Sequence, residues 1–189
     1  AGLYAYTDDP KYAVVNGINY DKIEILARMH NSLDFIPYEK YGSSHSGWYA
    51  TDRQNNYLLA GSSPAEVCFT AHGDAEEYQA LQNTYFEAMK KMFIQRVEIK
   101  NLQRRNLLLF LNSDWNIITI WMEDNANYCD CEGCNQIVQK YGGYTSSVVI
   151  RFTKDLKQKI DDWFNSSEGS LYKIDDFKLR FSVSQKYGD

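Results

Sequence analysis

The stretch that decides the fold is NIITIWMEDNANYCDCEGCNQIVQKYGGYTSSVVIRFTKDL, residues 116–156. Its opening run, NIITIWM, is rich in β-branched residues and predicts a strand at 116–122 that is buried on both faces of a parallel sheet. Residues 134–141 predict a short helix that ends at Gly142-Gly143. Apolar residues then recur every three or four positions, which predicts a long helix. The buried face of that helix is expected to hold Val148, Val149, Phe152, Leu156, Ile160, Trp163 and Phe164.

Further strands and one more helix surround this stretch. Alternating apolar residues predict strands at 22–29 and 178–184, and a short apolar run predicts another at 65–70. Asp74, with Glu77 three residues on, forms a variant of the capping box and predicts an amphipathic helix that reaches about residue 96. Strands that alternate with helices indicate βαβ units and a parallel sheet.

The length of 189 residues favours a single domain of the α/β class. Complete (β/α)₈ barrels take about 250 residues, so the predicted strands amount to a partial TIM-type barrel, roughly half of one. We expect an irregular lead-in at residues 1–21 and the barrel core at 22–189, as a fragment of a larger barrel. Residues 97–115 fit either a second helix or an extended insert.

Composition argues against several function classes. The net charge is −5 and the basic residues form no stripe, which disfavours nucleic-acid binding. The longest apolar run, residues 107–111, is far shorter than the ~20 residues that span a bilayer, and the start of the chain shows no signal peptide. No G-x-S-x-G, G-x-G-x-x-G or Walker motif is present. Aromatic residues make up 15% of the chain, which suits either sugar stacking or core packing.

The four cysteines form the sharpest pattern. Cys129, Cys131 and Cys134 make a C-x-C-x₂-C motif, and Cys68 precedes it in the chain. Four thiolates are the number that a tetrahedral structural zinc requires. One or two disulfides, or four buried free thiols, are the alternatives that the spacing leaves open. No cofactor is expected to be required for catalysis.

Two carboxylates follow the central strand. Glu123 and Asp124 lie where strand 116–122 ends, and ligand sites of parallel α/β folds form at that end. Either residue is a candidate for acid, base or nucleophile at a glycosidic bond, although Asp124 is also a plausible helix or turn cap. His30 and His72 follow predicted strands and are expected at the same edge. Possible partner carboxylates are Asp34, Asp52 and Asp74, and possible stacking platforms are Trp48, Tyr49 and Trp121.

Three stretches carry a resemblance to a known family: HNSLDFIPYEKYGSSHSGWYA (30–50), VCFTAHGDAEEY (67–78) and the segment from residue 118 to 156. They resemble a family of secreted bacterial barrel domains, classed as a domain of unknown function, that is distantly similar to α-glucuronidases and β-hexosaminidases. The Tyr128-Cys129-x-Cys131-x₂-Cys134 element is the most specific part of the match, which covers about residues 28–165. The sequence departs from the family after His45, where Ser46-Gly47 replaces a proline and an acid.

The resemblance implies an extracellular or cell-surface glycoside hydrolase with a carbohydrate substrate, completed by further barrel segments or domains of a larger parent protein. It implies Asp124 as the first choice for the catalytic carboxylate and Glu123 as the second. The side chains implied to bind the sugar are His30, His45, His72, Asn125 and Tyr128. The main alternative is a non-catalytic carbohydrate-binding or structural module. A metal-dependent hydrolase is less well supported, because no H-E-x-x-H motif occurs.

Overall fold

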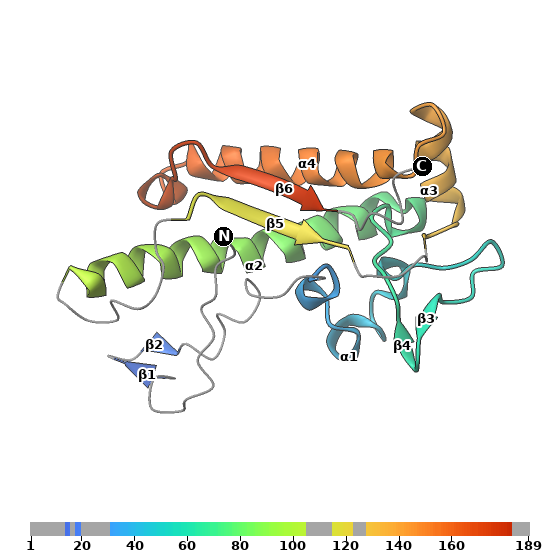
Figure 1. Cartoon of the computed structure of the whole chain (residues 1–189), viewed down its shortest axis with the longest axis horizontal. Helices are drawn as coiled ribbons and strands as arrows, with labels where there is room; N and C mark the ends of the chain where they lie inside the picture. The colour runs from blue at the N-terminus through green and yellow to red at the C-terminus, as the bar shows by residue number, and fades with distance from the viewer. Residues whose placement is uncertain (1–13, 16–17, 20–30, 105–114, 123–127, 183–189) are drawn as a thin grey trace.

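The computed structural model describes residues 14–15, 18–19, 31–104, 115–122 and 128–182 (Figure 1). Its strands are β1 (Val14–Val15), β2 (Ile18–Asn19), β3 (Leu59–Ala60), β4 (Ser63–Pro64), β5 (Ile117–Trp121) and β6 (Lys178–Ser182). Its α-helices are α1 (Tyr38–Tyr41), α2 (Ala75–Gln103), α3 (Glu132–Lys140) and α4 (Ser146–Phe164). Short 3₁₀ turns are η3 (Leu33–Phe35), η4 (Ser46–Trp48), η5 (Ala71–Gly73) and η6 (Gly169–Tyr172).

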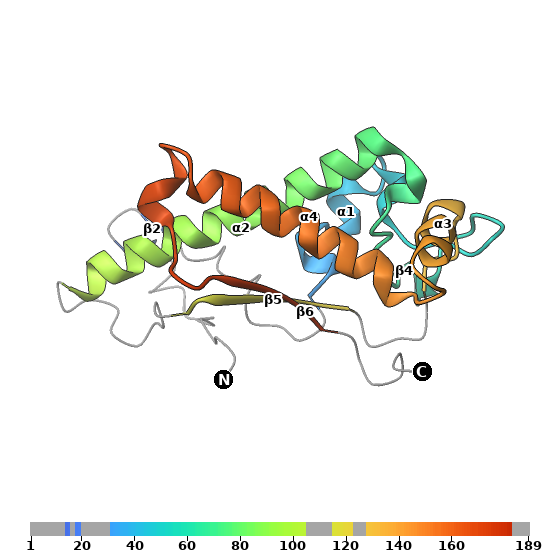
Figure 2. The same ribbon diagram turned by 90° about the horizontal axis from the view of Figure 1, so that it is seen from above.

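The centre of the fold is a βαβ unit. Strand β5 is followed by α3 and α4, and β6 then returns to pair with β5 in parallel, from Ile117 opposite Lys178 to Trp121 opposite Ser182. Helices α2 and α4 pack on each other and lie together on one side of the β5–β6 pair (Figure 2). The predicted α/β class and the strands at 116–122 and 178–184 are therefore confirmed.

The burial of β5 differs from the prediction. Ile118 and Ile120 are buried, whereas Ile117, Thr119 and Trp121 are only half-buried. The prediction of burial on both faces is wrong for the described part of the chain, because there the helices α2 and α4 cover only one face of the strand pair. Side chains of a strand alternate between faces, so only every second residue of β5 reaches the core.

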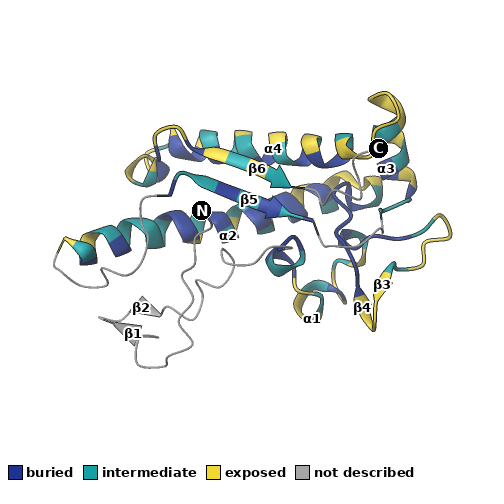
Figure 3. Ribbon diagram, viewed as in Figure 1, coloured by how far each residue is buried: buried dark blue, intermediate teal, exposed yellow. Residues whose placement is uncertain are grey.

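Helix α4 follows the sequence prediction closely. The buried residues of α4 are the seven that the apolar periodicity selects, and Figure 3 shows its buried side toward the core. Helix α3 ends at Lys140, within one residue of the predicted end, and the predicted stop signals Gly142 and Gly143 adopt φ values of +83° and +91°. Positive φ is favourable for glycine, and the Gly143 N–H donates to the Val138 carbonyl at 2.8 Å, which closes the last turn.

Helix α2 starts at the predicted cap and extends past the predicted end. The Asp74 carboxylate accepts hydrogen bonds from the backbone N–H groups of Glu76 and Glu77 at 2.9 and 3.0 Å. The helix continues to Gln103, so the first part of the ambiguous segment 97–115 is helical. Its buried residues are Tyr78, Leu81, Gln82, Tyr85, Met89, Met92, Phe93, Ile99 and Leu102.

The strand expected at 65–70 does not form. Residues 65–70 are all buried, but their backbone meets residues 48–50 through two hydrogen bonds instead of joining the β5–β6 sheet. The Ala50 N–H donates to the Glu66 carbonyl at 2.9 Å, and the Cys68 N–H donates to the Trp48 carbonyl at 2.8 Å. An apolar run of six residues fits a buried irregular segment as well as a strand, and burial alone cannot distinguish the two.

The edge of β5 away from β6 contacts residues 31 and 32. The Ser32 N–H donates to the Trp121 carbonyl at 2.9 Å, and the Asn31 side chain accepts from the Trp121 N–H at 2.9 Å. The strand predicted at 22–29 lies outside the described residues, and the described residues by themselves form no barrel. None of the helices described here is long and apolar enough to cross a membrane.

Candidate metal centre

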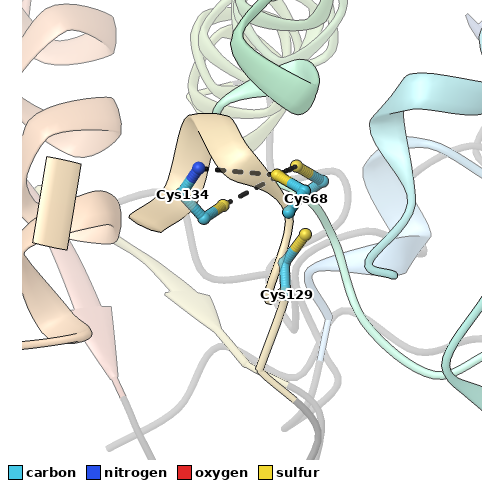
Figure 4. A group of neighbouring side chains, drawn as sticks. Cys68, Cys129 and Cys134 are labelled. Atoms are coloured by element: carbon cyan, nitrogen blue, oxygen red, sulfur yellow. Dashed lines mark hydrogen bonds between the residues drawn. The ribbon is translucent and has the colours of Figure 1, made fainter. Parts of the chain in front are cut away.

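The structure brings the sulfur atoms of all four cysteines to one place (Figure 4). Cys68 comes from the buried segment before η5, Cys129 precedes α3, Cys131 caps α3 and Cys134 lies in its first turn. The four Sγ atoms lie within 4.8 Å of one another. The segment from Cys129 to Cys134 is thereby held against a segment about sixty residues earlier in the chain.

The distances between the sulfurs distinguish a disulfide from a set of separate thiols. The Cys68 Sγ atom lies 3.7 Å from that of Cys131 and 3.8 Å from that of Cys134. A disulfide requires about 2.05 Å, so these sulfurs are not bonded, and all four cysteines are free. A tetrahedral zinc with Zn–S bonds of about 2.3 Å places its sulfurs about 3.8 Å apart. The observed spacing therefore matches a four-thiolate metal site.

Backbone N–H groups point at three of the sulfurs. The N–H of His72 donates to Cys68 Sγ at 3.3 Å, that of Cys134 to Cys131 Sγ at 3.4 Å, and that of Thr51 to Cys129 Sγ at 3.5 Å. Donors to a metal-bound thiolate fix its orientation and offset part of its negative charge. The cluster therefore has outer contacts of the type that support metal ligands.

A close approach of two glycines positions the ligand-bearing segments. A Cβ atom on Gly133 would lie 2.4 Å from the backbone nitrogen of Gly73, so no other residue fits there without a backbone shift. Gly73 has φ +90°, and its neighbours Ala71 and His72 also adopt positive φ values of 47° and 55°. Such strain persists where surrounding contacts stabilise it, here the packing of η5 against α3.

The sulfurs strongly perturb each other's ionisation. Hydrogen bonds from Cys129, Cys134 and Cys68 hold the pKa of Cys131 far below its usual range. Interactions with the other three thiols, together with burial, raise the pKa of Cys134. The His72 pKa is raised mainly by a hydrogen bond to Cys129. The pKa values of Cys68 and Cys131 are thus lowered while that of Cys134 is raised, and several thiolates held this close together require a positive charge among them.

The predicted sugar-binding histidines have other partners. His72 Nε2 lies 3.0 Å from the Tyr49 carbonyl and 3.5 Å from the Thr51 hydroxyl, beside the cysteines. His45 Nδ1 lies 2.9 Å from a Glu77 carboxylate oxygen, and its ring stacks on Trp48 with centroids 4.0 Å apart. The structure thus places the two histidines in different local environments.

Two of the predicted stacking platforms are unsuitable. Trp48 is 1% exposed and Tyr49 is fully buried, so neither ring offers a face to a sugar. Trp121 is half-buried in β5. Tyr128 is half-buried, and burial raises its pKa while a hydrogen bond to Thr145 acts in the opposite direction. Aromatic content alone indicated sugar stacking or core packing, and for Trp48 and Tyr49 the outcome is core packing.

Several predicted residues lie outside the described part of the chain, namely His30, Glu123, Asp124 and Asn125. Of the possible partner carboxylates, Asp52 accepts from the backbone N–H groups of Gln54 and Asn56, both at 2.8 Å, and so stabilises a turn. Asp74 caps α2, and Asp34 lies half-buried in η3.

One buried carboxylate near β5 was not predicted from the sequence. Glu66 is 1% exposed, and its Oε1 atom accepts from the Ser32 hydroxyl at 2.9 Å and from the Val67 N–H at 2.8 Å. Since Ser32 also bonds to Trp121, Glu66 lies near the carboxyl end of β5. A charged residue inside the apolar run AEVCF was the available signal, because a buried carboxylate needs specific partners.

A small cavity lies next to the cysteines. Its volume is about 30 Å³, and its lining includes Phe69, Met122, Val138 and Val149. That volume is far below the roughly 300–1,000 Å³ of typical ligand pockets. No family model, curated protein or solved structure matches the chain.

Proposed function

We propose that this protein binds one zinc ion through Cys68, Cys129, Cys131 and Cys134, and that the ion has a structural role. The observation that carries the proposal is the Sγ–Sγ spacing of 3.7 and 3.8 Å, which fits a tetrahedral four-sulfur site. Four protein ligands complete the coordination of zinc and leave no position for a substrate or a reactive water.

The geometry of the ligands supports a role as a staple. The ion would join the segment before η5 to the start of α3, and so restrain the loop that follows β5. Polar contacts reinforce the same junction: the Asp130 N–H donates to the Thr51 carbonyl at 2.8 Å, and Arg53 Nε lies 2.6 Å from the Asp130 carboxylate. A loop rich in Asn, Asp and Glu has little apolar surface to hold it, which makes a metal useful there.

Metal analysis of the purified chain tests this proposal. We expect one equivalent of zinc per chain and no thiol accessible to a thiol reagent until a chelator is added. Iron also accepts four thiolates in a tetrahedron, and visible absorbance separates it from colourless zinc. Four reactive thiols in a folded, metal-free protein that takes up no added zinc would reject the proposal.

A second candidate is hydrolysis of a glycosidic bond at the end of β5, with the barrel completed by further segments of a larger secreted parent. The observation that favours it is the buried Glu66 near the carboxyl end of β5, since Glu123 and Asp124 follow that strand directly. A nearby buried carboxylate would raise the pKa of a second carboxyl group, as a general acid requires. The cysteine motif and its family resemblance support the same proposal.

A screen of chromogenic glycosides, run with this chain and with any longer parent, tests the second candidate. We expect Asp124→Asn to abolish hydrolysis while leaving the circular dichroism spectrum unchanged, because an amide cannot act as acid, base or nucleophile in the same way. Asp162→Asn, on the exposed side of α4, serves as the control. An unchanged kcat in the Asp124 variant would remove that residue from the mechanism.

A further inference from the structure

A pocket of about 480 Å³ lies at the corner between α3 and α4, apart from the cysteines. Tyr141 and Tyr144, in the connection between the two helices, line the pocket and are 51% and 67% exposed. The exposed Ile150 of α4 lines the same pocket. Exposed apolar side chains that gather around a hollow are typical of ligand-binding grooves. The volume falls within the usual range for small-ligand pockets.

Three charged side chains of α4 complete the pocket: Arg151, Lys154 and Asp155. The buried Tyr78 of α2 fixes two of them. Its hydroxyl donates to Asp155 Oδ2 at 2.8 Å, and the Arg151 guanidinium lies over its ring at 4.8 Å. Arg151 Nε is 3.8 Å from the Asp155 carboxylate, so that donor and acceptor are held side by side.

We propose that this pocket binds a saccharide that carries a carboxylate. Sugar rings present flat C–H faces that pack on aromatic rings, and their hydroxyl groups need both donors and acceptors. The tyrosines supply the rings, and Arg151 and Asp155 supply a paired donor and acceptor. Two cations against one anion leave a local positive charge in a chain of net charge −5, which selects an acidic sugar over a neutral one.

The pocket fits this ligand better than a protein partner. Three charged side chains line the same pocket as the two tyrosines and Ile150, whereas the buried core of a protein interface is depleted of charged residues. The proposal concerns binding without bond cleavage. It rests on neither the zinc site nor Asp124, and the failure of either leaves it standing.

NMR titration of the ¹⁵N-labelled chain tests the proposal. The probes are oligosaccharides of galacturonate, of mannuronate and of glucuronate-bearing xylan, together with fully methyl-esterified oligogalacturonate as the uncharged control. At least one acidic probe should shift amide signals within residues 141–155, and the ester should bind at least five-fold more weakly.

Tyr144→Ala and Lys154→Gln should each weaken binding of that acidic probe by about five-fold or more, as expected for the loss of one stacking or charged contact. Leu171→Ala removes an exposed apolar side chain elsewhere and should leave the affinity unchanged. Both pocket residues are exposed, so folding should persist, and the spectra themselves report it. The proposal is overturned if no acidic probe binds, if the shifts map outside the pocket, or if the ester binds equally well.

Discussion

At the scale of single residues, the four sulfurs are not equivalent. Cys68, Cys131 and Cys134 are buried, whereas Cys129 is half-buried and lies at the end of the polar loop after β5. The packing of η5 on α3 fixes the positions of the three buried cysteines. Cys129 Sγ accepts a hydrogen bond from the Thr51 N–H. Loss of any one of them leaves three thiolates, which is too few to complete a closed zinc site.

Replacement of one ligand should therefore release the metal. We expect Cys131→Ser to reduce zinc content well below one equivalent and to lower the melting temperature, because zinc binding contributes directly to folding free energy. Tyr128→Phe is the control: it changes a residue three positions before Cys131 that is not a ligand, and it should keep the full zinc content. Inductively coupled plasma mass spectrometry with differential scanning calorimetry measures both effects. Full zinc occupancy in Cys131→Ser would show that Cys131 is not a ligand.

The close contact between Gly133 and Gly73 predicts that a side chain at position 133 destabilises the fold. Gly133→Ala should destabilise the fold by about 1–3 kcal/mol, because its Cβ would overlap the backbone of Gly73. Gly47→Ala is the matched control, since a Cβ there meets its nearest atoms at 3.7 Å, an ordinary contact. Urea denaturation of both variants gives the comparison. Equal stability of the two would contradict the close approach of η5 and α3.

At the scale of elements, the Asp74 cap determines where helix α2 begins. Asp74→Ala should cost about 1 kcal/mol of unfolding free energy, because two N–H groups of the first turn lose their acceptor. Asp175→Ala removes an exposed carboxylate in a turn and should change stability by less than about 0.5 kcal/mol. Urea denaturation curves measure both. A cost no larger than that of the control would argue against the cap.

The elements that the sequence predicted best are those with long, regular patterns. The apolar periodicity of α4 selects its whole buried face, and the β-branched run places β5 within one residue at each end. The segment 65–70 was predicted wrongly because a run of buried residues is compatible with irregular structure whose polar backbone finds local partners. The end of α2 was ambiguous because NLQRRN has neither a clear stop signal nor a clear period.

The candidate site was predictable only in part. The presence of four thiols, three of them in a C-x-C-x₂-C motif, predicted a metal site at the four cysteines. Cys68 lies sixty-one residues before Cys129, however, and only tertiary packing brings it close to the other three. Glu66 escaped notice because a single carboxylate carries no spacing signal. Trp48 and Tyr49 were weighed as ligand platforms, but exposure depends on packing against α2 and η5, which composition does not encode.

At the scale of the whole molecule, the cysteine cluster ties together two parts of the fold. One part is the βαβ unit with α2 packed on it, and the apolar core extends from this part into the second. The other is the less regular region between η3 and η5, where short 3₁₀ turns and the β3–β4 hairpin dominate. The cluster lies at their junction, since Cys68 belongs to the irregular region and the other three belong to the connection after β5.

This arrangement predicts that metal removal loosens one end of the molecule. Chelation should increase hydrogen exchange at residues 68–73 and 128–135, because both segments depend on the ion for their relative position. Amides of α4 and β5 should keep their protection, because they are held by the apolar core. Uniform loss of protection would mean that the metal controls global folding, and no change anywhere would contradict the staple.

X-ray absorption at the zinc K-edge of the purified protein identifies the atoms that bind the metal and so tests the four-sulfur zinc site. We expect a single shell of four sulfur atoms at about 2.3 Å. No nitrogen or oxygen ligand is expected, so His72 should lie outside the coordination sphere despite its position beside Cys129. A shell that contains nitrogen or oxygen would contradict the four-sulfur zinc site, and so would a protein that binds no zinc and has four reactive thiols.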